Sequence, residues 1–386
     1  MTVIRLYKGY QLFNGLLLWL PIFYLYQRDI GLTDQEIFGI QAIYYVAFCL
    51  LDVPTGVLAD RFDYRRFLQL GAITLTAANL IPVFAQNYWG FLGHFLLIAL
   101  AYSFTSGAGS AYVYEYPGQD DLYKQAEGSA RAYSLTGRVV ALPAAGVLMQ
   151  WHFTSPYWLS AAATLIALGI ASKLPPLPPG EHHHEKLAVK RAVATLKRDH
   201  YLVLLMVQGV AIFTLVRILQ ANLFQPVLDA KHLPVAGFGV LMAVTTLFEA
   251  LGAARPNLIR RAMSDLRAVF VLTTVMAVCL ALLAPAGLVA TIACLCVFSL
   301  ATGLSFPVQR QLVNDAITDP RSRATLLSIE SLIDRAVCSL VIFLLGGYLA
   351  HGAMNEFLVH AAVGTVLLMV VVALSIRFVR TKERSG

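Results

Sequence analysis

Long apolar segments separated by short polar ones dominate the chain. One helical crossing of a bilayer core about 30 Å thick takes about 20 predominantly apolar residues, and the sequence holds twelve segments of that kind. Backbone polar groups in lipid must be satisfied within the segment itself, so we expect helices rather than isolated strands. The expected spans are residues 8–27, 37–58, 67–85, 89–113, 131–150, 155–172, 202–225, 236–254, 268–285, 287–309, 325–349 and 357–377.

Composition agrees with a chain whose main solvent is lipid. Hydrophobic residues make up 58% of the chain and charged residues 13%, whereas a globular protein carries about 25% charged residues. The mean hydropathy of +0.68 excludes a disordered chain as well.

The cysteines all lie inside apolar segments and lack the spacing of a metal site. We therefore expect them to be small packing residues; they are Cys49, Cys279, Cys294, Cys296 and Cys338.

Basic residues are distributed unequally between the two sides that twelve crossings define. With an even number of spans both termini lie on one side. Of the 29 Lys and Arg residues, three lie in the interior of expected spans (Arg138, Arg217 and Arg335), Arg28 and Lys231 fall on the opposite side, and all the others fall on the side of the termini. The positive-inside rule therefore predicts cytoplasmic termini in a multi-pass cell membrane protein. Short loops suit a bacterial inner membrane. Phospholipid headgroups account for the net charge of +7, so we expect no nucleic acid as a partner.

One longer polar segment divides the chain. Residues 174–200 begin with a proline-rich stretch and continue after Glu185 with a basic amphipathic pattern, which predicts a helix on the membrane surface. The run His182–His184 has no further ligand at suitable spacing, so we expect no metal site. The predicted organisation is an N-terminal six-helix bundle (1–173), a cytoplasmic linker (174–200) and a C-terminal six-helix bundle (201–386).

The two halves repeat each other at an offset of 197 residues. Asp52 falls on Glu249, and Arg138 falls on Arg335, each in a corresponding span. Charged residues inside a membrane are costly and rare, so their coincidence in position and sign indicates a duplicated architecture. Repeated bundles are typical of transporters, in which the substrate binds between the halves near the middle of the membrane.

The segment after the second expected span carries a recognisable motif, GVLADRFDYRR, from Gly56 to Arg66. It resembles the signature loop of the major facilitator superfamily, roughly G-x-L-A-D-R-x-G-R-R, although Asp63 and Tyr64 replace a glycine and an arginine. With the twelve spans, the linker and the repeat, the resemblance covers the whole chain. It implies an all-α integral membrane fold of two pseudo-symmetric six-helix bundles, similar to bacterial efflux-type members.

In the family that it resembles, this loop latches the cytoplasmic ends of the two halves. Gly56 is then expected to allow close helix approach, and Asp60 to hold the cluster of Arg61, Arg65 and Arg66. The alternative is a plain positive-inside anchor. Export is implied by the resemblance and not by these residues, because the span-four arginine and the span-five glycine–proline pair of proton-coupled drug exporters are absent.

Intramembrane charges give the sharpest prediction of a functional site. The resemblance implies that spans two and eleven, and spans five and eight, meet between the halves. At a rise of 1.5 Å per residue, Asp52 and Arg335 lie about 12 and 15 Å from the cytoplasmic ends of their spans. We expect two ion pairs that close a cytoplasmic gate, Asp52 with Arg335 and Glu249 with Arg138. Static pairing within one half, such as Arg138 with Glu115, is the alternative.

Two carboxylates lie four residues apart in the eleventh span. Glu330 and Asp334 share one helix face, and double ionisation is disfavoured there in a low dielectric unless a cation intervenes. We therefore expect one of them to take up a proton, with Asp334 the first candidate for proton coupling, and with Glu115 and Glu249 next. A fixed salt-bridge network is the alternative.

Polar residues on spans one, four, seven and ten are the candidates for substrate contact, because the resemblance implies that these spans line the cavity. Arg217 would suit an anionic substrate, or would reach a lipid headgroup instead. Helix–helix hydrogen bonding is the alternative role for each candidate. The candidates are Gln11, Asn14, Tyr102, Gln208, Arg217 and Gln309.

The predicted function is secondary active transport of a small organic solute by alternating access, with proton-coupled efflux as the leading form. An uptake carrier for an organic anion, an integral-membrane lipid enzyme and a non-transporting sensor are the alternatives. The sequence has no G-x-x-x-x-G-K-[ST] loop and no clustered catalytic residues, so we expect neither ATP-driven transport nor an enzyme. We expect no cofactor or metal, a proton gradient as the energy source, the lipid bilayer and a small-molecule substrate as partners, and a monomer.

Overall fold

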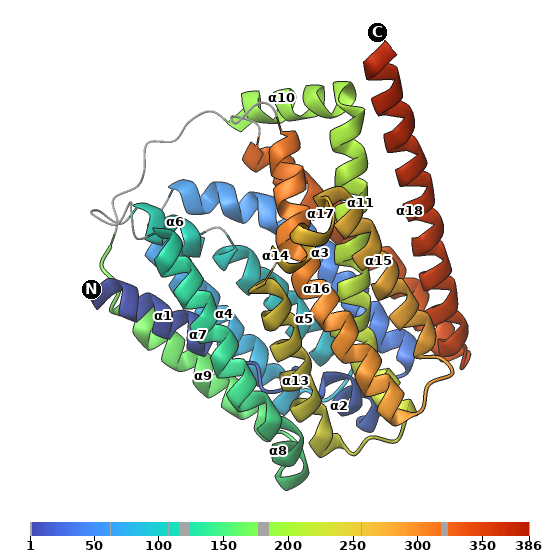
Figure 1. Ribbon diagram of the computed structural model, residues 1–386. Coiled ribbons are helices and arrows are strands. Elements are labelled where there is room, and N and C mark those ends of the chain that lie inside the picture. The colour runs from blue at the N-terminus through green and yellow to red at the C-terminus, as the bar shows by residue number, and fades with distance from the viewer. Residues whose placement is uncertain are drawn as a thin grey trace. The chain divides into compact units, whose positions relative to one another are not determined.

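The computed structural model describes residues 2–61, 63–106, 108–115, 123–176, 185–255, 257–317 and 323–385. Within these ranges every regular element is a helix, as Figure 1 shows, and no strand occurs. This agrees with the expected all-α membrane fold.

The described helices account for most of the expected spans. Ten helical segments are long and apolar enough to cross a membrane, and an eleventh is added if the bent pair Ala132–Ala141 and Ala144–Trp151 counts as one span. The first expected span, 8–27, differs from the prediction because it is split into α1 (Thr2–Asn14) and α2 (Phe23–Asp29).

The break in the first span is held by the surrounding protein. The backbone N–H of Leu18 donates to Ser160 Oγ at 2.8 Å, and the indole of Trp19 donates to Asn79 Oδ1 at 2.8 Å. Non-helical backbone is tolerated at membrane depth only where protein or water satisfies it. The side chains of Leu17, Trp19 and Ile22 are buried, so this stretch belongs to the packed interior.

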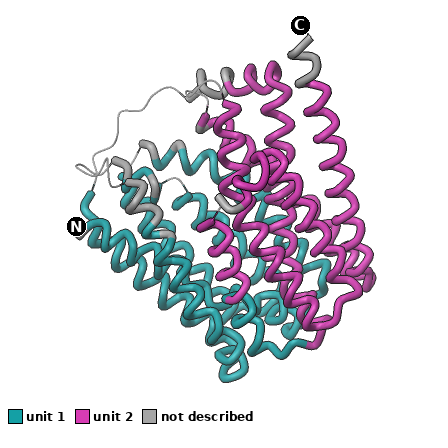
Figure 2. The backbone as a smooth tube through the Cα atoms, viewed as in Figure 1, with its two compact units in different colours: residues 1–182, 233–243 teal, residues 183–232, 244–386 magenta. Residues whose placement is uncertain are grey.

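The chain forms two compact units, which Figure 2 colours separately. Unit 1 comprises Met1–His182 with Leu233–Ala243, and unit 2 comprises His183–His232 with Val244–Gly386. The helix α13 (Val235–Ala253) is therefore divided between them.

Unit 1 contains the helices of the first half of the chain. The expected span 89–113 is described as two helices, because α5 ends at Thr105 and α6 begins at Ala108. Asp63 begins α4 as its N-cap, because its side chain accepts a hydrogen bond from Arg65 N at 3.0 Å. After α1 and α2, the helices are α3 (Asp34–Arg61), α4 (Tyr64–Phe84), α5 (Tyr88–Thr105), α6 (Ala108–Glu115), α7 (Tyr123–Ala141), the 3₁₀ turn η1 (Leu142–Ala144), α8 (Ala145–Trp151) and α9 (Ser155–Ser172).

An aromatic cluster forms part of the interior of unit 1. Trp19 stacks on Tyr157 with ring centroids 5.8 Å apart and meets His94 edge-on at 5.0 Å. The His94 ring is fully buried, and its Nδ1 lies 2.6 Å from the carbonyl oxygen of Ala78, so the proton must sit on Nδ1 to donate. His94 is therefore a packing residue of this interior.

Unit 2 contains the helices of the second half. The predicted end of the span 287–309 was wrong, because the helix α16 continues to Ala316 and therefore includes Arg310. The elements are α10 (Glu185–Arg198), α11 (His200–Val216), the π-helical segment η2 (Arg217–Leu223), α12 (Phe224–Ala230), the remainder of α13, α14 (Asn257–Ala262), α15 (Asp265–Leu282), α16 (Leu288–Ala316), α17 (Arg323–Ala350) and α18 (Met354–Ser385).

Glycines allow α13 to approach its neighbours closely inside each unit. In unit 1 a Cβ on Gly239 would collide with the carbonyl oxygen of Leu142. In unit 2 a Cβ on Gly303 would collide with the carbonyl oxygen of Glu249, and one on Gly252 with that of Leu300. Small residues at such contacts are how membrane helices gain van der Waals packing where no hydrophobic effect drives association.

The amphipathic helix expected after Glu185 is present as α10. Ala192 is fully buried in a cluster with Leu202 and Leu326, and Leu196 packs against the same cluster. One face of α10 therefore packs on α11 and α17, whereas Lys197 and Arg198 at its end are exposed. Histidines 182–184 lie outside the described residues.

Candidate functional site

Unit 2 contains a polar cluster that starts where α11 changes from α-helical to π-helical geometry. The segment η2 begins at Arg217, and the side-chain amide of Asn222 donates to the Arg217 carbonyl oxygen at 2.8 Å. Short π-helical segments shift the register of a helix and are frequent at functional sites. Arg217 itself keeps α-helical dihedral angles, and its backbone N–H donates to the Phe213 carbonyl oxygen, so the change of register begins after it.

Arg217 pairs with a buried carboxylate on α17. Its Nη2 and Nε lie 2.8 and 3.0 Å from Asp334 Oδ2. The Asp334 side chain is 2% exposed and that of Arg217 is 35% exposed. Asp334 Oδ1 makes no hydrogen bond with any residue that the structure describes. The pair compensates the carboxylate charge, and the arginine binds protein instead of reaching toward a lipid headgroup.

A second pair joins α16 to α17. Arg310 Nη1 lies 3.1 Å from Glu330 Oε2, and the Glu330 side chain is 2% exposed. Glu330 Oε1 has no hydrogen bond within the described part of the chain. Sequence reasoning missed Arg310, because the span prediction ended at the preceding residue. The carboxylates that we expected on one face of α17 are thus both buried, each with its own arginine.

Gly209 of α11 brings two predicted site residues together. A Cβ at this position would lie 2.5 Å from Glu330 Oε1 and 2.8 Å from Gln309 Nε2. The Gln309 amide donates to the carbonyl oxygen of Leu205 on the same helix at 2.7 Å. Only a residue without a side chain allows the carboxylate and the amide to reach the α11 backbone this closely.

The neighbouring Gln208 is fully buried. Neither its Oε1 nor its Nε2 has a hydrogen-bond partner among the described residues. Buried amides are normally satisfied, so Gln208 carries hydrogen-bonding capacity that the described residues do not use.

Glu249 has a partner from the same π-helical segment. Gln220 Nε2 lies 3.2 Å from Glu249 Oε2 and 3.3 Å from Ser299 Oγ. The segment η2 therefore presents Arg217 to α17 and Gln220 to α13 and α16. Gln220 was not among the residues predicted from the sequence, because a single glutamine in an apolar segment has no distinctive spacing.

The charged candidates of unit 1 also make local contacts. Arg138 Nε donates to the carbonyl oxygen of Gly15 at 3.0 Å, just beyond the last residue of α1. A cation is favourable there, because the last carbonyls of a helix carry partial negative charge. Asp52 Oδ1 accepts a hydrogen bond from Ser106 Oγ at 2.6 Å. The Glu115 side chain, predicted as a partner for Arg138, lies outside the described part of the structure.

The two predicted gate pairs each join one residue of unit 1 to one residue of unit 2. Asp52 with Arg335, and Arg138 with Glu249, stay predictions from the sequence.

The substrate candidates of unit 1 lie on α1 and α5. Gln11 Nε2 donates to the Tyr7 hydroxyl at 2.8 Å. Asn14 is buried, and its Oδ1 has no hydrogen bond to a described residue. Tyr102 is half-buried on α5. Among these residues, Asn14 resembles Gln208 in being buried with unused hydrogen-bonding capacity.

The predicted latch motif has a local structural role in unit 1. Arg65 Nη1 donates to the carbonyl oxygen of Leu174, just beyond α9, at 3.1 Å. Arg66 is exposed. A Cβ on Gly56 would meet no described atom within 4 Å, and the close helix approach expected there stays a prediction. The side chains of Asp60 and Arg61 lie outside the described part.

Comparisons with known proteins identify the family. Residues 10–333 match the profile of the Major Facilitator Superfamily. An uncharacterized transporter of Buchnera aphidicola is 20% identical over 156 residues, which is 40% of this chain and 39% of that protein. Folate-like transporter 3 of Caenorhabditis elegans is 25% identical over 185 residues, 46% of this chain and 42% of that one. The chain thus spans about two fifths of the length of these relatives.

Solved structures of transporters have the same fold. The nucleoside transporter NupG superposes with a TM-score of 0.78 at 14% identity, over 97% of this chain and 99% of that one. A POT family transporter in complex with 5-aminolevulinic acid gives 0.76 at 12% identity, over 97% and 95% of the two chains. The family profile covers most of the sequence and the fold covers nearly all of it. The chain therefore belongs to the Major Facilitator Superfamily.

Proposed function

We propose that this transporter exports a small organic solute in exchange for protons, and that Glu330 and Asp334 are its proton-coupling carboxyls. One observation carries the proposal. Each carboxylate is buried on α17, binds an arginine of another helix through one oxygen, and has no hydrogen bond at its other oxygen among the described residues.

The physical basis is a competition for the arginine. A carboxylate in a low-dielectric site stays ionised while a guanidinium compensates it, and favours protonation once that guanidinium moves away. Arg217 lies in the π-helical segment η2 and Arg310 near the end of α16, on the spans that the family resemblance assigns to the cavity. A conformational change that separates either pair would thereby change the proton occupancy of α17.

The solute contacts that we propose are polar groups with unused hydrogen-bonding capacity. Gln208 and Asn14 are buried with unpartnered atoms among the described residues. Gln11, Tyr102 and Gln309 complete the proposed set, together with Arg217 when it leaves Asp334. The proposed cytoplasmic gate consists of Asp52 with Arg335 and Glu249 with Arg138, next to the latch motif at Gly56, Asp60, Arg61, Arg65 and Arg66.

An uptake carrier for an organic anion is the second candidate. The Arg217 and Arg310 side chains are 35% and 34% exposed, whereas their carboxylate partners are almost completely buried. Protonation of Asp334 or Glu330 would leave an arginine available for a carboxylate or phosphate of a solute. This candidate uses the same residues and differs in the relative direction of solute and proton movement.

Proton flux in proteoliposomes tests the proposal. The purified protein is reconstituted with a pH-sensitive dye inside, and solutes of several classes are added: amphiphilic amines, nucleosides, small peptides and organic anions. The names of the relatives, which include folate-like and nucleoside transporters, span several chemistries, so a panel is needed. We expect one class to drive protons in the direction opposite to its own. Movement of protons and solute in the same direction would show symport and replace the exchange with the uptake candidate, and counterflow without proton movement would refute coupling.

A further inference from the structure

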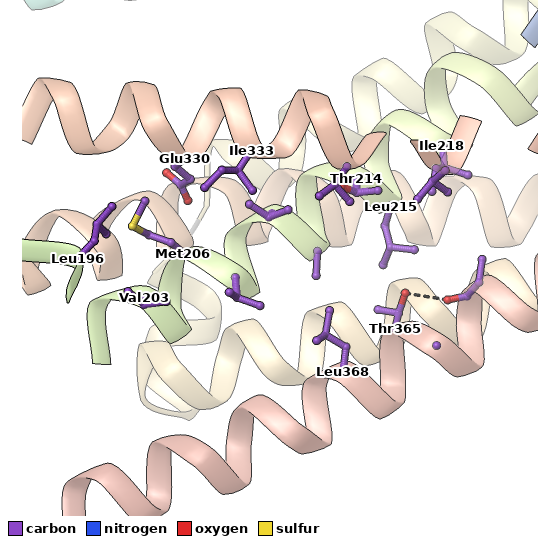
Figure 3. A pocket seen from close by; sticks show the side chains of 17 residues that line it. Leu196, Val203, Met206, Thr214, Leu215, Ile218, Glu330, Ile333, Thr365 and Leu368 are labelled. Atoms are coloured by element: carbon purple, nitrogen blue, oxygen red, sulfur yellow. Dashed lines mark hydrogen bonds between the residues drawn. The ribbon is translucent and has the colours of Figure 1, made fainter. Parts of the chain in front are cut away.

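An apolar groove lies within unit 2. It shares one lining residue, Glu330, with the polar cluster of the proposed function. It has a volume of about 550 Å³ and runs along α11 between α17 and α18. Figure 3 shows the groove from Leu196 and Val203 at one end to Ile218 at the other. Its walls are formed mainly by aliphatic side chains, such as Val337 of α17 and Leu368 of α18.

The dimensions of the groove match a lipid chain. Val203 and Ile218 are 15 residues apart on one helical run, which at 1.5 Å per residue corresponds to about 22 Å. One leaflet occupies about half of a hydrocarbon core of about 30 Å. The groove is therefore long enough to hold most of the length of one acyl chain.

The groove is also open along one side. Ile333, Val337 and Leu368 line it and are between 38% and 46% exposed. Leu368 belongs to α18, which is not among the spans expected to meet between the halves, and lipids cover exposed aliphatic side chains on such a helix of a membrane-embedded chain.

Positive charge marks one end of the groove. Leu196 of α10 lines the groove, and the next two residues, Lys197 and Arg198, are exposed in the last turn of that helix. The positive-inside pattern predicts that α10 lies on the cytoplasmic side, where basic segments attract anionic headgroups. The apolar groove and the basic helix end thus lie next to each other, as the tail and headgroup of one phospholipid require.

The wall contains one carboxylate, and its charge is compensated. Glu330 lines the groove near the α10 end (Figure 3). Because Glu330 Oε2 binds Arg310 at 3.1 Å, the pair carries no net charge and does not repel an anionic lipid.

We propose that this groove binds an anionic phospholipid, with one acyl chain along α11 between α17 and α18 and the headgroup at Lys197 and Arg198. The site is distinct from the proposed solute contacts and does not depend on the direction or coupling of transport.

Gly364 of α18 offers a way to fill the groove without disturbing the helix packing. It lines the groove, and a Cβ there would meet no described atom within 4 Å. Gly347 of α17 is equally open but is not among the lining residues. Gly364→Phe is therefore the groove-filling variant, and Gly347→Phe is its matched control.

The test is native mass spectrometry of the full-length protein. Wild type and variants are equilibrated with phosphatidylglycerol and phosphatidylcholine of identical acyl chains. We expect wild type and Gly347→Phe to retain one phosphatidylglycerol in preference to phosphatidylcholine. Gly364→Phe should lose the bound-lipid peak, whereas Lys197→Glu with Arg198→Glu should lose only the headgroup preference. Thermal unfolding of each variant checks that it is folded.

Several outcomes would overturn the proposal. Retention of lipid by Gly364→Phe at the wild-type level would show that the groove is not the site. A preference that survives the double charge reversal would remove the headgroup assignment. A retained mass equal to a free fatty acid would replace the phospholipid with a single-chain lipid. A change in oligomeric state caused by Gly364→Phe alone would assign the groove to a second copy of the chain.

Discussion

At the scale of single residues, the cost of burying charge organises unit 2. Asp334 and Glu330 are nearly inaccessible, and each is compensated by one arginine. Removing one partner of a buried pair leaves an uncompensated charge, whereas replacing both partners can be nearly neutral. In each pair, a single substitution is therefore expected to lower the free energy of unfolding more than a double substitution does.

The first prediction concerns the Arg217–Asp334 pair. Arg217→Gln should lower the free energy of unfolding by about 2 kcal/mol, less than the roughly 3–5 kcal/mol of a fully buried pair, because the guanidinium is 35% exposed. Arg217→Gln combined with Asp334→Asn should recover most of this loss. Denaturant unfolding in detergent measures both. A double variant no more stable than Arg217→Gln would contradict the assignment of the pair.

The second prediction concerns Gly209. Gly209→Ala should displace Glu330 and Gln309, because the added Cβ would lie 2.5 and 2.8 Å from their polar atoms. Overpacking of this kind costs about 1–3 kcal/mol, and we expect a matching loss of stability in thermal unfolding. Gly169→Ala on α9 is the control, because its Cβ would meet no described atom within 4 Å. Equal stability of the two variants would argue against the tight contact at Gly209.

At the scale of elements, the π-helical segment η2 connects α11 to three other helices. Arg217 contacts α17, and Gln220 contacts α13 and α16. Within the segment, the side-chain amide of the buried residue Asn222 donates to the carbonyl oxygen of Arg217. The segment η2 therefore connects the Arg217–Asp334 pair to the hydrogen bonds of Gln220 with Glu249 and Ser299.

The third prediction tests the role of Asn222 in holding this segment. Asn222→Ala removes the side-chain hydrogen bond to the Arg217 carbonyl oxygen and should cost about 0.5–1.5 kcal/mol, the net contribution of one such hydrogen bond. Denaturant unfolding measures the loss. Thr274→Ala on α15 serves as the control, since that exposed hydroxyl bonds only within its own helix. An unchanged stability in Asn222→Ala would show that the π-helical geometry does not depend on this side chain.

Hydropathy predicts elements better than it predicts their ends or their local geometry. The spans follow from apolar length, and the position of α10 follows from its basic amphipathic pattern. The break at residues 15–22 arises where Gly15 and Pro21 weaken the helix. The hydropathy pattern does not show this break, because the segment is apolar throughout. The predicted end of α16 was wrong, because the polar residues after Gln309 are equally compatible with a loop and with a helix that continues out of the membrane. The π-helical geometry of η2 cannot be predicted from hydropathy, because it does not change the pattern of apolar residues.

The candidate site was predictable only where one helix determines it. The four-residue spacing of Glu330 and Asp334 indicated a common face, and both are buried. Their partners Arg310 and Arg217 come from other helices, so tertiary packing and not sequence spacing selects them. The buried, unpartnered state of Gln208 likewise depends on packing that the sequence does not reveal.

At the scale of the whole molecule, the internal repeat relates residues of the two units. Thr105 and Thr302, which are 197 residues apart, both bond the carbonyl oxygen four residues earlier in their helices. The intramembrane charges Asp52, Glu249, Arg138 and Arg335 follow the same offset. Alternating access between repeated bundles gives such charges a gating role.

The fourth prediction is a charge swap across the proposed gate. Asp52→Arg and Arg335→Asp should each reduce solute counterflow strongly, because each leaves two like charges at the gate. The combined swap should restore a substantial part of the activity if the residues pair. A double variant no more active than either single variant would show that they do not pair.

The fifth prediction addresses the central claim, that the buried carboxyls of α17 couple solute movement to protons. Solute-dependent proton flux and solute counterflow are measured side by side for wild type, for Glu330→Gln with Asp334→Asn, and for Glu356→Gln, an exposed control at the start of α18. We predict that the double variant keeps counterflow and loses proton flux, whereas the control keeps both. A double variant that still moves protons with the solute would contradict the claim.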